Sequence, residues 1–237
     1  GLKVKKYAEI MADVIGMFET IGVSGTHGKT STSSMLRHLL ENTLGCNYFI
    51  GAGDGCATKD NKYFVVESDE FNRHFKYYHP YYSIITNVEV DHIDYYKDLD
   101  DVLDAFTTFA NSSSKCTIMC GDDENIKRIK VNNPCMYYGF NEENDVYAKN
   151  IRLLEDDITL IDVYIKDKYF DTYTLPFVGD HLILNLLAVI TVCYLENIDK
   201  NEIKTQVSKI KHAKRRFIEE EFKSNILKQI KELKIPN

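Results

Sequence analysis

The sequence predicts an α/β fold, with a mostly parallel sheet flanked by helices and a small antiparallel β section at about 145–178. Three features predict it. Short, nearly continuous apolar runs suit strands that are covered on both faces, as in a parallel sheet. Segments with helical spacing alternate with those runs. A glycine-rich turn, "GTHGKT", joins the first short strand to a helix, so we expect a P-loop-type sheet.

The elements of the parallel part follow in chain order. The first strand, "TIGVSG", precedes the glycine turn. Apolar residues near helical spacing predict helices at 3–18, 30–44, 99–110 and 122–130. The apolar runs that predict buried strands lie at 62–68, 81–88, 115–121 and 135–140.

The pattern changes near residue 145. Apolar and polar residues alternate through "DVYAKNIRLL" and "ITLIDVYIKDKYFDTYTLPF", with a turn at 166–168, and this predicts antiparallel strands. Two helices follow at about 180–196 and 199–211, and Asp199 is the expected N-cap of the second. The end of the chain, 223–237, has the pattern of a short amphipathic helix.

Composition limits the class of protein. A chain of 237 residues can form one large domain, or one domain with a smaller appendage. It has neither an apolar run of membrane-spanning length nor a secretory signal at its start. The net charge of −7 argues against a nucleic-acid surface. Six cysteines without CxxC spacing suit reduced, buried thiols in a cytosolic protein.

The glycine turn has the parts that a triphosphate requires. Backbone N–H groups must converge on the phosphates, and glycines permit that close approach. The start of a helix adds a favourable dipole, a lysine bridges the phosphates, and a hydroxyl group binds Mg²⁺. Val23 replaces the first glycine of the common phosphate-loop pattern. The alternative is a chance glycine turn with a solvated lysine.

Five motifs carry a resemblance to a known family. In chain order they are "GTHGKTSTS", "FVVESDEFNRHF", "IITNVEVDHIDYY", "GDHLILN" and "KRRF". The sequence resembles the Mur ligases in this order from about residue 7 to 222. The resemblance implies that 1–222 is a central ATP-binding domain. A trailing helix at 223–237 would then be the start or a remnant of a C-terminal domain. We expect the N-terminal UDP-binding domain of the family to be absent, and the first residue, Gly1, suggests a fragment.

The resemblance also implies a set of site residues and two cofactors, ATP and Mg²⁺. The residues expected to bind ATP are Gly25, Thr26, His27, Gly28, Lys29, Thr30, Ser31, His181, Asn185 and Arg216. Those expected to hold magnesium are Thr30, Glu67 and His92. The expected catalytic residues are Lys29, Glu67, His92 and Arg216.

Other polar residues in these motifs allow two interpretations. Asp69 and Glu70 either support Glu67 or form a solvated acidic loop, and we favour the loop. Asn87 lies either near the substrate carboxylate or in the hydrogen bonding of the loop. Arg73 and His74 either reach the anionic muramyl substrate or have a surface role.

Two positions depart from the pattern of the family. Leu182 occupies a place where many relatives have an asparagine, and it cannot make that residue's hydrogen bonds to the nucleotide. Thr107 occupies the place of a lysine that some members carry in carbamylated form. Losing one amide contact costs about 1 kcal/mol, which weakens binding several-fold without abolishing it.

The resemblance implies an ATP-dependent amide ligase of the bacterial cytoplasm. The motifs look most like the branch that joins L-alanine to UDP-N-acetylmuramate, with no nucleic-acid or membrane partner. One alternative is the branch that recycles murein tripeptide. The others are a nucleotide-binding module without ligase chemistry and, less favoured, a P-loop kinase. If the chain is part of a ligase of either branch, we expect it to be inactive alone.

Overall fold

The computed structural model describes residues 6–51, 53–91 and 95–210. Their strands form a single ten-stranded sheet in the order β10-β9-β8-β7-β6-β5-β1-β4-β2-β3. The strands are β1 (Glu19–Ser24), β2 (Cys46–Ile50), β3 (Asp54–Cys56), β4 (Tyr63–Glu67), β5 (Tyr82–Ile85), β6 (Cys116–Cys120), β7 (Cys135–Gly139), β8 (Val146–Leu153), β9 (Thr159–Ile165) and β10 (Lys168–Leu175). From β2 to β8 neighbouring strands are parallel, which confirms the predicted fold class.

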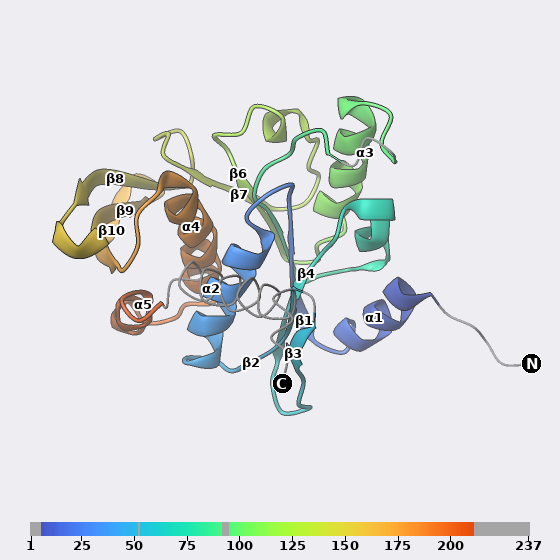
Figure 1. The fold of residues 1–237 in the computed structure, drawn as a ribbon, viewed down its shortest axis with the longest axis horizontal. Helices are drawn as coiled ribbons and strands as arrows, with labels where there is room; N and C mark the ends of the chain where they lie inside the picture. Colours follow the sequence, from blue (N-terminus) through green and yellow to red (C-terminus); the bar gives the residue numbers. More distant parts are fainter. Residues whose placement is uncertain (1–5, 52, 92–94, 211–237) are drawn as a thin grey trace, which may run out of the picture.

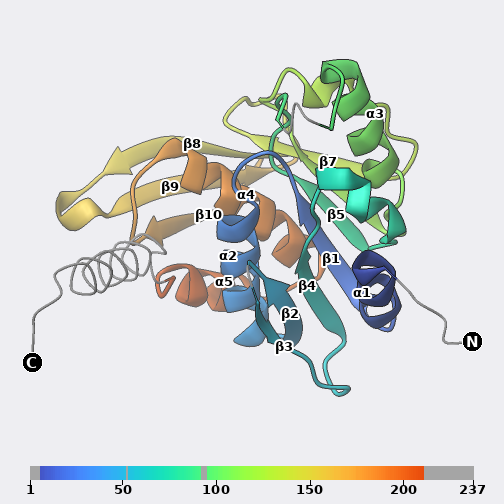
Figure 2. The same ribbon diagram turned by 45° about the vertical axis from the view of Figure 1, so that its right-hand side comes forward.

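Helices cover both faces of this sheet (Figures 1 and 2). The α-helices are α1 (Tyr7–Ile15), α2 (Lys29–Glu41), α3 (Leu99–Ala110), α4 (Asp180–Leu195) and α5 (Lys200–Val207), and the 3₁₀ turns are η1 (Phe71–Tyr77), η2 (Ile126–Arg128) and η3 (Glu155–Asp157). On one face α2 packs against α4 and α5, and on the other η1 packs against α1 and α3. Within the described part of the chain, none of the helices is both long and apolar enough to cross a membrane.

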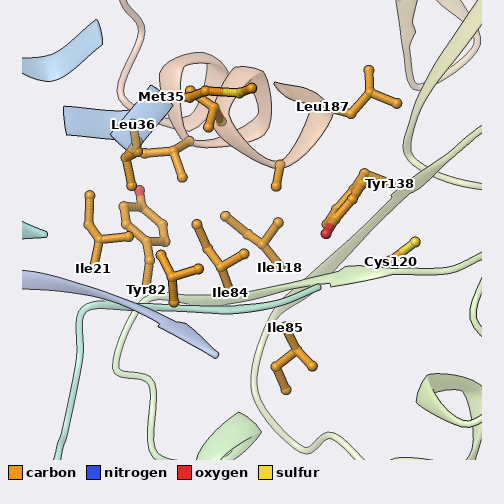
Figure 3. Packing of buried hydrophobic residues seen from close by; sticks show 14 of the residues in the cluster. Ile21, Met35, Leu36, Tyr82, Ile84, Ile85, Ile118, Cys120, Tyr138 and Leu187 are labelled. Atoms are coloured by element: carbon orange, nitrogen blue, oxygen red, sulfur yellow. The ribbon is translucent and has the colours of Figure 1, made fainter. Parts of the chain in front are cut away.

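The core between the sheet and α2 and α4 is fully buried (Figure 3). Ile21, Ile84 and Ile118, from three neighbouring strands, have no exposed surface, and neither do Leu36 of α2 and Leu187 of α4. Near-continuous apolar strands are what a sheet with helices on both faces requires. This packing fixes the start of α2 and the start of α4 relative to the carboxyl ends of the central strands.

The antiparallel section extends the same sheet beyond β8. The strand β9 pairs antiparallel with both β8 and β10. Lys166 and Asp167 connect β9 to β10 with φ angles of 49° and 62°. Two consecutive residues with positive φ are typical of the tight hairpin turn that matches strand twist, and this confirms the predicted turn. Asp199 caps α5 as predicted, because its side chain accepts a hydrogen bond from Asn201 N.

Two predictions were wrong, and two strands were missed. The segment 122–130 forms only the short turn η2, because Asp123 Oδ1 accepts hydrogen bonds from the backbone nitrogens of Asn125 and Ile126 and so favours a turn over a helix. The strands β2 and β3 were not predicted; buried Asn47 interrupts the apolar pattern of β2, and its amide is satisfied by the backbone of Thr58. Not all thiols are buried, since Cys56 and Cys135 are exposed. The predicted trailing helix at 223–237 lies outside the described residues.

Candidate functional site

The loop between β1 and α2 is shaped by two glycines. Gly25 and Gly28 have φ angles of 137° and 85°, in a region that other residues rarely enter. A β-carbon on Gly25 would overlap the hydroxyl oxygen of Thr86 and lie 3.1 Å from the backbone nitrogen of Asn87. A β-carbon on Gly28 would lie 2.7 Å from Asn185 Oδ1. The loop is therefore held between the end of β5 and the first turns of α4.

The start of α2 presents unpaired backbone donors beside this loop. The first hydrogen bond of the helix runs from Thr32 N to the carbonyl oxygen of Gly28, at 2.9 Å. The amides that precede it, those of Lys29, Thr30 and Ser31, have no acceptor within the helix. Gly28 is the N-cap and has no side chain that could cap them. Together with the helix dipole, these amides form a position suited to an anion.

Lys29 points back into the loop. Its Nζ lies 2.5 Å from the carbonyl oxygen of Gly25 and 2.9 and 3.0 Å from the two carboxylate oxygens of Glu70. The Lys29 side chain is 20% exposed and that of Glu70 only 4%. Burial raises the pKa of Glu70, and the charge of Lys29 opposes that shift. The expectation that Glu70 belongs to a solvated acidic loop is therefore wrong, whereas Asp69 is exposed.

Asn87 clamps the glycine loop from the end of β5. Its Oδ1 accepts a hydrogen bond from His27 N at 2.8 Å, and its Nδ2 donates to the carbonyl oxygen of His27 at 2.9 Å. Thr86 Oγ1 donates to the same carbonyl oxygen at 2.6 Å. Glu89 N donates to Thr26 Oγ1 at 2.9 Å. Of the two interpretations of Asn87, the structure shows the hydrogen bonding of the loop.

The substitution Asn87→Asp is expected to weaken nucleotide binding by roughly 5- to 150-fold, equivalent to about 1–3 kcal/mol. The carboxylate keeps the acceptor for His27 N but loses the donor to His27 O, and it adds negative charge beside the loop. Calorimetric titration with ADP measures the effect. Asn132→Asp, an exposed change far along the chain, is the matched control and should bind like the wild type. Equal affinity of Asn87→Asp and Asn132→Asp would show that the clamp does not matter.

Glu67, the last residue of β4, lines a cavity at the carboxyl end of that strand. It lies next to Val23 of β1 in the parallel register, and its Oε1 accepts a hydrogen bond from Gly51 N at 3.0 Å. The cavity has a volume of about 310 Å³, and Lys29, Glu67 and Asp69 all line it. A cation and two carboxylates from different elements thus share one cavity at the sheet edge where α/β folds bind ligands.

The rest of the cavity wall is more apolar. It is formed by Tyr7 and Met11 of α1, Phe49 of β2, Val66 of β4, His74 of η1 and the adjacent Tyr78. Burial raises the pKa of Tyr78 to about 12, so its hydroxyl stays protonated at neutral pH. The sequence did not indicate α1 or β2 as parts of the site, because their apolar residues there look like ordinary core residues. Charged groups facing an aromatic wall suit a ligand that has both anionic and apolar parts.

Arg73 and His74 are separated by the structure. His74 lines the cavity. The guanidinium of Arg73 instead donates to Asp101 Oδ1 at 2.6 Å and to Asp104 Oδ2 at 2.7 Å, which ties η1 to α3. The hydrogen bond to Asp104 is the largest cause that raises the pKa of Arg73 above its ordinary value. Burial opposes this shift, and Asp101 adds to it. A role of Arg73 in substrate binding stays a prediction, and it requires the side chain to leave both carboxylates.

The start of α4 places Asn185 against the glycine loop. Asn185 is buried and contacts Gly28, whereas His181 is exposed beside Gly179. Leu182 is 8% exposed and belongs to the apolar core. Leucine is compatible with this position because the side chain packs in the core. Contacts of His181 and Asn185 with a nucleotide stay predictions.

The described residues fit magnesium that is bound together with phosphate. Thr30 follows Lys29 at the start of α2, and Glu67 shares the cavity with Lys29. Hydroxyl and carboxylate oxygens are ligands that Mg²⁺ accepts, and it commonly completes its shell with water and substrate phosphates. In residues 6–51, 53–91 and 95–210, no group of three or more His, Cys, Asp or Glu side chains is placed to hold a metal. His92 and Arg216 lie outside the described residues.

Comparison with known proteins agrees with this architecture. The fold is similar to UDP-N-acetylmuramate:L-alanyl-gamma-D-glutamyl-meso-diaminopimelate ligase (MPL) from Neisseria meningitides, with 22% identity and a TM-score of 0.76 over 86% of this chain and 70% of that one. For UDP-N-acetylmuramate-alanine ligase MurC from Thermotoga maritima, the identity is 22% and the TM-score 0.73, over 84% of this chain and 47% of that one. For MurF from Thermotoga maritima in complex with ADP, the identity is 18% and the TM-score 0.70, over 89% of this chain and 54% of that one.

These likenesses concern the fold, and the chain spans about half the length of the MurC and MurF structures. The family is identified by comparing the sequence with family models. The family model of the Mur ligase middle domain matches residues 23–193. The match runs from the end of β1, through the glycine loop and the Glu67 cavity, to the last turn of α4. It therefore covers most of the chain, and the chain belongs to the Mur ligase middle-domain family.

Proposed function

We propose that this chain is the ATP-binding part of an ATP-dependent amide ligase of bacterial peptidoglycan precursor synthesis. The observation that carries the proposal is the placement of Lys29, at the open start of α2, in the same cavity as Glu67. A cationic loop suits the phosphates of ATP, and a neighbouring carboxylate suits the magnesium that accompanies them. The chain spans 47% of the MurC and 54% of the MurF structure, so the proposed activity is that of the full-length ligase.

The proposed reaction has two steps. A carboxylate oxygen of UDP-N-acetylmuramate attacks the γ-phosphorus of ATP, the bond to ADP breaks, and an acyl phosphate forms. The amine of L-alanine then attacks the acyl carbon through a tetrahedral intermediate, loses a proton, and expels inorganic phosphate. Catalysis rests on positioning and charge neutralisation rather than on a protein nucleophile.

Each predicted residue has a place in this scheme. Lys29 and Arg216 neutralise phosphate oxygens. Thr30, Glu67 and His92 would hold magnesium, which would shield the negative charges of the carboxylate and the phosphates. The backbone of the loop surrounds the phosphates, and the side chains that assist it there and at the start of α4 are Thr26, His27, Ser31, His181 and Asn185. His74, and Arg73 if it is released from α3, would contact the muramyl substrate.

The acceptor amine distinguishes the two ligase branches. The motifs "ESDEFNRHF" and "DHIDYY" favour L-alanine, while the similarity to the MurC and MPL structures does not separate them, at 22% identity in each case. We expect the full-length enzyme, given ATP and UDP-N-acetylmuramate, to release ADP with L-alanine at least about a hundredfold faster than with the tripeptide L-alanyl-γ-D-glutamyl-meso-diaminopimelate. Preference for the tripeptide would assign the recycling branch. Nucleotide binding without turnover on either amine would favour a non-catalytic module.

A further inference from the structure

The backbone of Val88 is held by two side chains from the segment between β6 and η2. Val88 N donates a hydrogen bond to Asp123 Oδ2 at 3.1 Å, and the carbonyl oxygen of Val88 accepts one from Asn125 Nδ2 at 2.7 Å. Val88 itself has no exposed surface. Its N–H and carbonyl groups are therefore both satisfied by side chains that lie more than 30 positions further along the chain.

The two neighbours of Val88 hold the glycine loop. The carbonyl oxygen of Asn87 accepts a hydrogen bond from Thr26 N at 3.2 Å, and the Asn87 side chain bonds both backbone groups of His27. On the other side, Glu89 N donates to Thr26 Oγ1 at 2.9 Å. A shift of Val88 would move both neighbours, and with them the loop whose backbone N–H groups must converge on a phosphate.

Asp123 divides its carboxylate between Val88 and the turn that follows. Oδ1 accepts hydrogen bonds from Asn125 N at 2.8 Å and from Ile126 N at 2.9 Å, which leaves Oδ2 for Val88. Ionised acceptors make stronger hydrogen bonds than neutral ones. An asparagine that kept the two bonds of the turn would direct its NH₂ group at the N–H of Val88, and two donors would then face each other.

We propose that Asp123 is a positioning residue for the phosphate site. Through Val88 it holds Asn87 and Glu89 where they clamp the glycine loop, and Asn125 assists from the carbonyl side. The proposal rests on the proposed function, because it assumes that nucleotide phosphates occupy the glycine loop. It does not require the nucleotide to touch Asp123.

The adjacent residue, Asp122, provides a matched control. Like Asp123 it is half-buried, and its carboxylate also accepts three hydrogen bonds. They come from Phe140 N at 2.5 Å, Asn141 N at 3.2 Å and Asn144 Nδ2 at 2.8 Å, so Asp122 holds the connection between β7 and β8 instead. Asp122→Asn and Asp123→Asn each remove one negative charge. Loss of negative charge favours an anionic ligand, so charge alone cannot explain weaker binding by either variant.

The test combines two measurements on this chain. Calorimetric titration gives the affinity for Mg–ADP, and NMR-detected hydrogen exchange gives the protection of the His27 amide, which Asn87 accepts. Asp123→Asn should weaken binding and speed up exchange of that amide by about tenfold each, the effect of one lost hydrogen bond to a charged group. Asp122→Asn should leave both values close to those of the wild type, even if it lowers stability in urea.

Two further variants keep the test decisive. Asn125→Ala removes the other side chain that holds Val88 and should change affinity and exchange in the same direction as Asp123→Asn. In a double-mutant cycle, Asn87→Asp and Asp123→Asn should be less than additive in their effects on affinity, because both release the same loop.

Equal affinity and equal His27 exchange in Asp122→Asn and Asp123→Asn would overturn the proposal, and so would full additivity in the cycle. If Asp123→Asn did not fold, unchanged affinity and exchange in Asn125→Ala would overturn it. A folded wild type that bound no nucleotide would contradict the proposed function. Exchange of the His27 amide would still decide whether Asp123 positions the loop.

Discussion

Replacing Lys29 with alanine is expected to lower turnover of the full-length ligase by about 10²–10³-fold, the effect of removing one preorganised charge-stabilising donor. The ammonium group lies inside the glycine loop, within hydrogen-bond distance of the Gly25 carbonyl oxygen. No other residue described in the cavity wall carries a permanent positive charge. ADP release, measured with saturating L-alanine and UDP-N-acetylmuramate, gives the effect. Lys127→Ala, an exposed change on η2, is the control and should behave like the wild type.

The same substitution should also destabilise the fold, which must be separated from the effect on activity. Lys29→Ala removes the ammonium group that is hydrogen-bonded to the buried carboxylate of Glu70, and removing one partner of a buried ion pair costs about 3–5 kcal/mol. The double variant Lys29→Ala/Glu70→Gln also removes the buried negative charge and should recover most of that stability in urea unfolding. It should remain inactive. If the double variant regained activity together with stability, Lys29 would have a structural role only.

Gly25→Ala is expected to have the second large effect. The substitution combines an unfavourable φ of 137° with overlap between the new methyl group and Thr86 Oγ1. We expect a loss of about 2–5 kcal/mol in the free energy of unfolding, from backbone strain and overpacking together. Nucleotide binding should be lost as well, because the loop must move away from the end of β5 to accommodate the methyl group. Urea unfolding and titration with Mg–ADP measure the two effects.

Gly53→Ala is the matched control for Gly25→Ala. Gly53 has a similar φ of 121°, but no atom lies within 4 Å of the position that its β-carbon would take. Backbone strain alone should therefore cost about 1–3 kcal/mol. If Gly25→Ala and Gly53→Ala were equally stable and bound Mg–ADP equally well, close packing of the loop against Thr86 would be irrelevant to the site.

Much of the parallel fold could be predicted from sequence, because strands buried on both faces and helices with one apolar face have distinct patterns. The helix at 99–110 was predicted with the bounds that α3 has in the structure. Prediction failed where a polar side chain satisfies the backbone locally. Asp123 forms hydrogen bonds that favour the short turn η2 over a helix. Asn47 interrupts the apolar pattern of β2, and its buried amide is tolerated because it pairs with the backbone of Thr58. These hydrogen bonds depend on partners that periodicity does not reveal.

The glycine loop of the site could be predicted from the sequence, but the residues that pack around the loop could not. The spacing of Gly25, Gly28 and Lys29 indicates a strand–loop–helix phosphate site on chemical grounds alone. The pairing of Lys29 with Glu70 joins residues 41 positions apart, and nothing in "ESDE" distinguishes a buried carboxylate from the exposed one at Asp69. Their difference arises because η1 turns back onto α3 and Tyr96, a tertiary effect.

Titration of this chain with ATP, with and without Mg²⁺, beside its Lys29→Ala/Glu70→Gln variant, tests the central claim most directly. The account predicts magnesium-dependent binding by the wild type and none by the variant, with both proteins folded as judged by circular dichroism. Equal binding by the two proteins, or no binding by a well-folded wild type, would contradict the claim that the loop at 25–31 holds the phosphates of ATP.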